Sequence, residues 1–330
     1  MIIAVASGKG GTGKTTVAVA LALSAGGPVV LADCDVEEPD CHIFLKPQIT
    51  GREAVKIRIP KVDGSVCNFC GECADFCRFN AIAVLRAEAL VFPELCHGCG
   101  GCSWICGRGA IREIQREIGT VEAGWRGGIC FVRGVLGVGQ ALSPPVIRAA
   151  RQAAAREAER AKAEMIIVDC PPGTACGMVT AVRGSDYVIL VAEPTPFGLH
   201  DLRLAVETVR QMCIPFGVVI NRCDWGYGGV DEYCAGEGIA VLMKIPHSRE
   251  VAEAYSRGVS ISRELTASRQ ISAHAPAPEP AGVFTLTGPP HPSAPVAPST
   301  IRHPSAMKDP LVHWLCPHRP RSYPFASLLQ

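Results

Sequence analysis

The chain has 330 residues and a net charge of +1, because 32 Lys and Arg residues are balanced by 31 Asp and Glu residues. This balance indicates no nucleic-acid partner, and no apolar run approaches the ~20 residues that a membrane span needs. The sequence also begins without the basic and apolar segments of a secretion signal. We therefore expect a soluble, cytoplasmic protein with no membrane anchor.

The first part of the chain has a strand–loop–helix–strand order. Residues 1–6 form a short aliphatic run that is typical of a buried strand, and residues 15–25 predict a helix that ends at a Gly-Gly-Pro sequence. Residues 29–32 predict the next strand. Two strands joined by a crossover helix predict a parallel sheet with helices on its faces.

A glycine-rich loop lies between the first predicted strand and the first predicted helix. The backbone amides of such a loop point toward phosphate oxygens, and the start of the helix adds a favourable partial charge. The spacing predicts that Lys14 contacts the β- and γ-phosphates of a nucleotide and that Thr15 ligates Mg²⁺. A glycine-rich turn without a ligand is disfavoured by the strand before the loop and the helix after it. The predicted loop comprises Gly8, Lys9, Gly10, Gly11, Thr12, Gly13, Lys14, Thr15 and Thr16.

Periodicity breaks between residues 60 and 118, where Cys and Gly are abundant. This segment contains two runs of the form C-x₂-C-x₂-C-x₃-C, an internal repeat that indicates a pseudo-twofold unit. The spacing is typical of [4Fe–4S] clusters, each held by three thiolates of one run and the fourth thiolate of the other. The expected ligands are Cys67, Cys70, Cys73 and Cys106 for one cluster, and Cys96, Cys99, Cys102 and Cys77 for the other.

Two other interpretations of the 17 cysteines agree less well with the pattern. Disulfides are typical of secreted proteins, but the chain shows no export signal and its cysteine count is odd. Structural zinc sites use cysteine pairs separated by a longer spacer, which differs from four cysteines at this spacing. Iron–sulfur ligation is therefore the prediction that we prefer.

Strands and helices alternate again after the cysteine-rich segment, which predicts a doubly wound α/β fold with a parallel sheet. The expected strands are residues 165–168, 187–192, 216–220 and 239–245, and the expected helices are residues 145–163, 199–212 and 248–256. The last part of the chain is rich in Pro and has little periodicity, so we expect it to be disordered.

The Lys-Gly-Gly-x-Gly-Lys-Thr sequence that begins at Lys9 resembles the deviant Walker A motif of the MinD/Mrp/ParA family of P-loop ATPases, which includes the nitrogenase iron protein. In that family the first lysine reaches across a nucleotide-sandwich dimer to the partner's phosphates. The resemblance therefore implies ATP as the nucleotide, a role in trans for Lys9, and a homodimer in the ATP-bound state. A solvated loop lysine is the alternative interpretation of Lys9.

Other residues match the motifs of this family in chain order. Asp35 resembles the switch I aspartate that orients the attacking water, whereas Asp33 either belongs to the same site or caps a turn. An Ile-Ile-Val-Asp-Cys-Pro-Pro-Gly sequence resembles Walker B and switch II, which places Asp169 in the Mg²⁺ shell and lets Gly173 respond to the γ-phosphate. Asn221 resembles the adenine-reading residue, with a surface turn as the alternative. The implied catalytic set is Lys9, Lys14, Asp35 and Asp169.

The two halves together resemble MinD-superfamily ATPases with an inserted ferredoxin domain that carries two [4Fe–4S] clusters. Cys176 has the same offset from the switch II aspartate as a cluster ligand of the nitrogenase iron protein, so it either holds an interfacial cluster or packs as a buried apolar residue. The implied division is a discontinuous P-loop ATPase domain (1–59 and 119–270), an inserted ferredoxin-like α+β module (60–118) and a Pro-rich tail (271–330).

Three functions are consistent with this resemblance. The first is an ATPase whose hydrolysis cycle gates electron transfer from the two clusters to a partner protein. The second is an assembly factor or carrier that delivers iron–sulfur or related clusters to an acceptor, although the C-terminal cysteine pair of Mrp-type carriers is absent here. The third is a MinD-like positioning protein, ranked last because no basic amphipathic helix ends the chain. Ferredoxin-type ligation favours permanent clusters, and therefore electron transfer.

Overall fold

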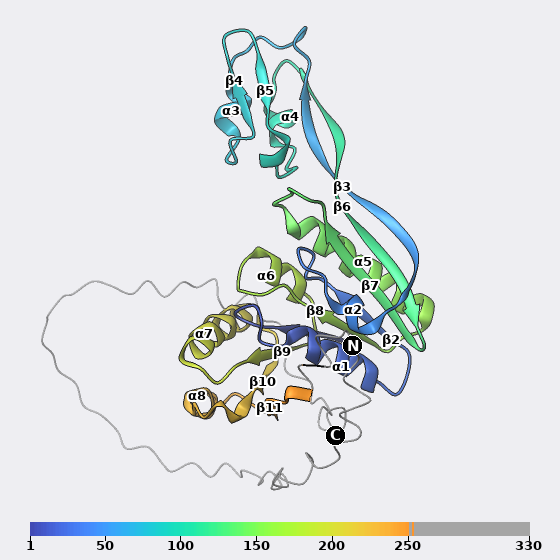
Figure 1. The fold of residues 1–330 in the computed structure, drawn as a ribbon. Coiled ribbons are helices and arrows are strands. Elements are labelled where there is room, and N and C mark those ends of the chain that lie inside the picture. The colour runs from blue at the N-terminus through green and yellow to red at the C-terminus, as the bar shows by residue number, and fades with distance from the viewer. Residues whose placement is uncertain (251–252, 254–330) are drawn as a thin grey trace, which may run out of the picture.

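A nine-stranded sheet forms the centre of the computed structural model, which describes residues 1–250 and residue 253 (Figure 1). Its strands are β1 (Ile2–Ala6), β2 (Val29–Asp33), β3 (Gln48–Val62), β6 (Ile111–Arg126), β7 (Ile129–Leu136), β8 (Met165–Asp169), β9 (Tyr187–Ala192), β10 (Phe216–Asn221) and β11 (Val241–Ile245). They lie in the order β11-β10-β9-β1-β8-β2-β7-β6-β3. The strands from β11 to β7 are parallel, whereas β6 and β3 pair antiparallel at one edge.

Helices cover both faces of this sheet, because successive residues of each central strand enter opposite cores. Ala4 and Val30 belong to one core and Ile3 and Leu31 to the other. The first core is covered by α5 (Ser143–Ala161), α6 (Cys176–Val182), α7 (Pro196–Gln211) and α8 (Gly229–Gly236), and the second by α1 (Lys14–Ser24) and α2 (Cys41–Leu45). The predicted doubly wound α/β fold is confirmed.

Most of the predicted elements in the α/β part are present near their expected bounds. The helix predicted for residues 145–163 is α5, and the strands predicted for residues 165–168 and 187–192 are β8 and β9. The short helices α6 and α8 are not predicted from the sequence, because each covers too few residues for a helical period to stand out. The predicted tail, and residues 251, 252 and 254–256 of the last predicted helix, lie outside the residues that the structure describes.

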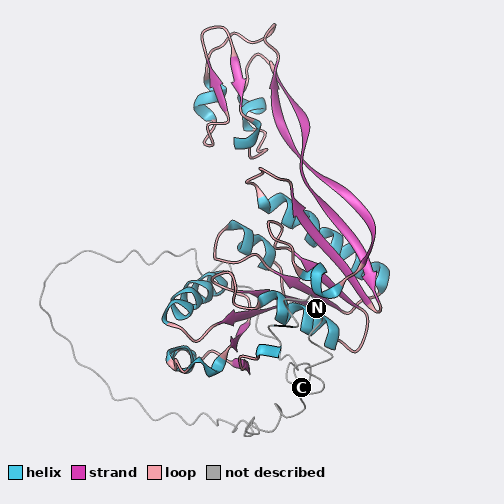
Figure 2. Cartoon of the chain, viewed as in Figure 1, coloured by secondary structure: helices cyan, strands magenta, loops and turns pink. Residues whose placement is uncertain are grey.

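Strands β3 and β6 form a long twisted ribbon that leaves the sheet as an arm (Figures 1 and 2). Their pairing runs from Gln48 opposite Trp125 at the base to Val62 opposite Ile111 at the far end. Only the base of β6 continues the sheet, where it pairs with β7. The boundaries predicted for the inserted module, residues 60 and 118, therefore fall inside two continuous strands.

The far end of the arm carries the cysteine-rich segment as a small module (Figure 1). It contains α3 (Glu72–Phe76), a two-stranded antiparallel sheet of β4 (Ile82–Val84) and β5 (Ala89–Val91), the 3-10 helix η1 (Pro93–Leu95) and α4 (Gly101–Ile105). Of the helices within the described part of the chain, none combines the length and the apolar character that crossing a bilayer requires.

Candidate functional site

The predicted phosphate loop connects β1 to α1 and is pressed against two neighbouring elements. A Cβ atom on Gly13, whose φ is +94°, would lie 2.5 Å from the side-chain nitrogen of Asn221. A Cβ atom on Gly8 would lie 2.1 Å from the backbone oxygen of Asp201 in α7. Only glycine fits such close contacts. Lys14 opens α1 and is 6% exposed, while Gly10 and Gly11 face solvent, as an approaching phosphate requires.

The hydroxyl of Thr15 and the carboxylate of Asp169 meet at the start of α1 and the end of β8. The Thr15 Oγ1 donates a hydrogen bond to Asp169 Oδ2 at 2.7 Å. The other carboxylate oxygen of Asp169 is buried and has no hydrogen-bond partner among the residues of the described structure. Mg²⁺ prefers oxygen ligands, and an orphaned carboxylate oxygen beside a hydroxyl fits such an ion.

Two more carboxylates lie next to this pair, those of Asp33, the last residue of β2, and Asp35, two residues further on. Asp33 accepts hydrogen bonds from the backbone N–H groups of Asp35 and Cys41 at 3.2 and 3.0 Å, so it caps the turn that leads to α2. Burial raises the pKa of Asp33, and the nearby charge of Asp169 raises it further. Burial also raises the pKa of Asp35 to about 7, although the Lys14 charge opposes the shift. This concentration of carboxylates favours a bound cation.

Lys9 does not extend freely into solvent. Its Nζ lies 3.0 Å from the Glu193 carboxylate at the end of β9, and the other oxygen of this carboxylate pairs with Arg222. Glu193 is 5% exposed, so its charge is compensated by these two cations. The sequence analysis did not identify Glu193, because a single glutamate after a strand belongs to no local motif.

Two further segments touch the phosphate loop. The Asn221 side-chain N–H donates to the Thr12 carbonyl at 2.8 Å, so Asn221 braces the loop in this structure. The Gly173 N–H donates to the Ser7 carbonyl at 3.0 Å, which joins the switch II segment to the same loop. The structure thus brings the phosphate loop, the three aspartates, Gly173 and Asn221 together at the carboxyl ends of the parallel strands.

Cys41 and Cys176 lie near this site in different environments. The thiol of Cys41 is fully buried and donates to Asp169 Oδ2 at 3.3 Å, a contact that no sequence motif indicates. Cys176 is the first residue of α6 and is exposed. The expectation that Cys176 packs as a buried apolar residue is therefore wrong.

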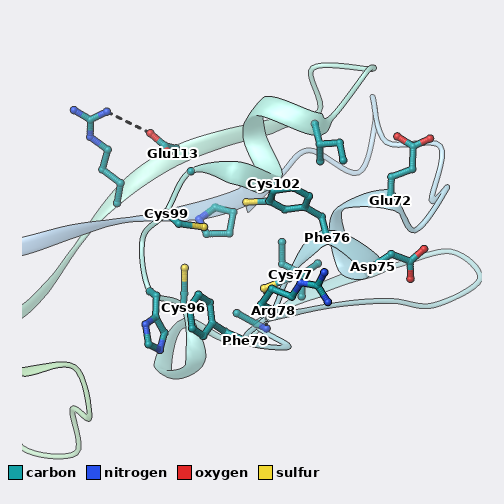
Figure 3. A pocket seen from close by; sticks show the side chains of 17 residues that line it. Glu72, Asp75, Phe76, Cys77, Arg78, Phe79, Cys96, Cys99, Cys102 and Glu113 are labelled. Carbon is teal, nitrogen blue, oxygen red and sulfur yellow. Dashed lines mark hydrogen bonds and ion pairs between the residues drawn. The ribbon is translucent and has the colours of Figure 1, made fainter. Parts of the chain in front are cut away.

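In the module, the eight motif cysteines line two cavities. We call the cavity bordered by Cys77, Cys96, Cys99 and Cys102 the inner site, and Figure 3 shows these four side chains around it. We call the cavity bordered by Cys67, Cys70, Cys73 and Cys106 the outer site. Each cavity thus has three cysteines of one run and the fourth of the other, which is the exchange expected from the spacing.

Backbone amides point at sulfurs of both sites. The N–H groups of Phe69, Ala81 and Gly98 donate to Cys67, Cys77 and Cys96 sulfurs at 3.3 to 3.4 Å. Such donors stabilise thiolates.

The module cysteines do not have the geometry of a zinc site. In the described ranges, the one group whose three ligand atoms lie within 4.8 Å of one another is Asp33, Cys41 and Asp169. No three of the module sulfurs meet that limit, whereas sulfurs around a tetrahedral zinc lie about 3.8 Å apart for Zn–S bonds of about 2.3 Å. Wide rings of four sulfurs with N–H donors fit a cubane cluster.

Comparisons with known proteins agree with the nucleotide half of this picture. The family model of the CobQ/CobB/MinD/ParA nucleotide binding domain matches residues 3–261. An uncharacterized protein of Methanocaldococcus jannaschii is 33% identical over 67% of this chain and 78% of its own. An iron-sulfur cluster carrier protein of Pyrococcus abyssi is 26% identical over 78% of each chain. The septum site-determining protein MinD of Pyrococcus horikoshii, solved with Mg-ADP, is 19% identical with a TM-score of 0.44 and covers 78% of this chain and 86% of its own.

Proposed function

The chain belongs to the CobQ/CobB/MinD/ParA family and is a P-loop ATPase, and from this premise we propose that its hydrolysis cycle gates electron transfer from two [4Fe–4S] clusters to a partner protein. The observation that carries the proposal is the pair of cysteine rings, because each ring combines three cysteines of one run with the fourth of the other. This arrangement is the one that holds two cubanes side by side.

In the nucleotide half, we assign a role to each residue by what it touches. Lys14 and the amides of the loop bind the phosphates, and Thr15 and Asp169 provide oxygens for Mg²⁺. Asp35 stands at the end of β2 with its pKa raised to about 7 by burial, so it is suited to hold or release a proton from the attacking water. Asn221 contacts the base of the nucleotide and also hydrogen-bonds to the Thr12 carbonyl of the loop.

In the module half, the clusters when bound supply one-electron redox chemistry at low potential. The residues of this chain hold the eight thiolates in two rings and direct N–H groups at three of them. Hydrogen bonds to cluster sulfurs and partial exposure set the potential. Aromatic side chains of Phe76 and Phe79 border the inner site (Figure 3).

The dimer is part of the proposal, since Lys9 reaches the partner's phosphates only when it leaves Glu193. The γ-phosphate would order the switch residues at Asp35 and Gly173, and the switches would present or withdraw a docking surface for the redox partner. Hydrolysis then returns Lys9 to Glu193 and resets the surface.

Delivery of a cluster to an acceptor is the second candidate function. The similarity to iron-sulfur cluster carrier proteins favours it, and so does the exposed thiol of Cys176, which a symmetric dimer could pair with its copy. It differs from electron transfer in what leaves the protein, which is iron and sulfide in place of electrons.

Stopped-flow absorbance with Mg-ATP and a candidate acceptor separates the two functions. Electron transfer from the dithionite-reduced clusters to the acceptor oxidises them, so the visible absorbance that reduction had bleached recovers while the iron content stays at about eight per chain. A fall in absorbance in step with loss of iron would assign the chain to delivery. The Lys14→Ala variant is the control, because it removes the dependence on ATP in either case.

A further inference from the structure

The two cluster sites lie at different positions along the arm. The outer site is bordered by Val62 and Ile111, the last pair of the β3–β6 ribbon. The inner site is bordered by Arg58 and Glu113, which lie further toward the sheet and form an ion pair of 3.4 Å. The inner site is therefore the one nearer to the ATPase part of the chain.

The inner site is also packed against the apolar cluster that connects the arm to the ATPase part. Cys96 contacts the hydrophobic core that contains Ile57, Ile59 and Ile118, and this core extends to the side chains of α5 and α6. A Cβ atom on Gly98, two residues after Cys96, would lie 3.1 Å from the Arg58 backbone oxygen. The loop that holds the inner-site cysteines is thus seated on the strands of the arm.

A packed route leads from switch II to the same core. A Cβ atom on Gly177 in α6 would lie 3.3 Å from the Pro171 ring and 3.6 Å from the end of the Ile147 side chain in α5. A Cβ atom on Gly119 in β6 would lie 3.0 Å from the side chain of Val146, the neighbour of Ile147 in α5. Switch II is therefore connected to the arm through α6 and α5, whose side chains belong to the same apolar cluster as Ile118 of β6 and Ile57 of β3.

The two cavities differ in size. The cavity volume is about 490 Å³ at the inner site and about 20 Å³ at the outer site. One wall of the inner site is a stacked pair, Phe79 on His97, with ring centroids 3.6 Å apart. Phe79 follows one cysteine run and His97 lies within the other, so the stacked pair connects the two runs at this wall.

From this geometry we propose that the inner site is the nucleotide-controlled cluster site, the one whose iron is reached from solvent and by a partner, while the outer site holds its cluster independently of nucleotide. The inference rests on the proposed function, since it requires two bound clusters and an ATPase cycle. Beyond that function, the inference specifies which of the two clusters responds to nucleotide. The structural cause is the combination of the larger cavity and a loop seated on the apolar cluster that connects the arm to the ATPase part.

Iron release to a ferrous chelator tests this proposal on the full-length, cluster-loaded chain. Dithionite keeps the released iron ferrous, and each iron leaves when its thiolate and sulfide bonds exchange for chelator nitrogens. We expect two phases of about four irons each. Mg-ATP changes the rate of the fast phase by about fivefold or more, within the range of allosteric coupling, and leaves the slow phase unchanged.

Two matched variants assign the phases. Cys99 and Cys70 are both exposed and hold the same position in the two runs. We expect Cys99→Ser to change only the fast phase and Cys70→Ser only the slow one. The proposal is overturned if the fast phase responds to Cys70→Ser, if both phases have one rate, or if Mg-ATP shifts both equally. If the chain takes up far fewer than about eight irons or hydrolyses no ATP, the proposed function fails instead.

Discussion

The nucleotide site and the cysteine module are built in opposite ways. The nucleotide site joins residues that are far apart in the sequence, such as Thr12 and Asn221, which are 209 positions apart. Its central carboxylates, Asp33 and Asp169, are fully buried. The module takes all its proposed ligands from residues 67–106, and none of these cysteines is buried.

This difference has a consequence for folding. The nucleotide site exists once the parallel sheet has formed, because the carboxyl ends of the strands bring its residues together. The module has little apolar core of its own, so we expect its order to depend on the clusters that we propose for its thiolates. The two sites are therefore expected to respond separately to substitution, and the following predictions test that separation, the largest expected effect first.

Lys14→Ala is expected to have the largest effect. The substitution removes the buried ammonium that binds the transferred phosphate, so ATP hydrolysis falls by about 100-fold or more. Iron content and the cluster EPR signal stay unchanged, because Lys14 lies in the ATPase part. Phosphate release and iron analysis on one sample measure both quantities. A parallel loss of iron would show that the two regions fold together.

The second-largest effect is expected for Cys106 and Cys102, two cysteines of one run that line different cavities. Cys106→Ser is expected to remove the outer cluster, and Cys102→Ser the inner one, although both residues belong to the same run. Each variant loses about four of the eight irons while the basal ATPase rate is retained. EPR of the reduced protein distinguishes the remaining cluster. Identical spectra from the two variants would contradict the exchanged ligation.

Glu193→Gln affects the nucleotide site alone. The substitution frees Lys9 from its partly buried ion pair, whose loss costs about 1 kcal/mol. ATP-dependent dimerisation is then expected to strengthen about fivefold, as measured by light scattering or analytical ultracentrifugation. Lys9→Ala serves as the control and abolishes the dimer. An unchanged dimerisation constant for Glu193→Gln would show that the pair does not restrain Lys9.

The smallest predicted effect concerns pH. The pKa of Asp35 in the folded chain, about 7, lies above its ordinary value of 3.8, so the folded state holds the proton more tightly than the unfolded state. Stability therefore falls as pH rises through about 7 in the nucleotide-free protein, by about 0.5–1 kcal/mol after allowance for partial exposure. Urea unfolding at several pH values measures the change. Asp35→Asn removes this component, and a variant with an unaltered pH slope would exclude Asp35 as its source.

Much of the α/β fold could be predicted because its signals are local. The run Met1–Ala6 and the helix after the phosphate loop show burial and periodicity within a few residues, and β1 and α1 occur there. The arm could not be predicted in the same way. Strand β3 is exposed over its first half and alternates only from Val55 onward, and its long pairing with β6 depends on contacts across the cysteine-rich segment.

The residues of the candidate site also fall into two groups, those that local sequence predicts and those that depend on contacts across the fold. The glycine loop and the cysteine runs are visible because their spacing has a physical meaning, namely phosphate contact and cubane ligation. Glu193 and Cys41 are invisible in the sequence because each acts through one contact across the fold. The packing of Cys96 on the apolar cluster that includes Ile57 and Ile59 likewise requires the arm to be placed first.

Reoxidation of the dithionite-reduced, cluster-loaded chain by a soluble viologen acceptor tests the central claim, that nucleotide controls the clusters, most directly. Mg-ATP is predicted to change the reoxidation rate by about fivefold or more, with iron content constant and with no response in Lys14→Ala. Equal rates with Mg-ATP, with Mg-ADP and without nucleotide, in protein that holds its iron and hydrolyses ATP, would contradict it.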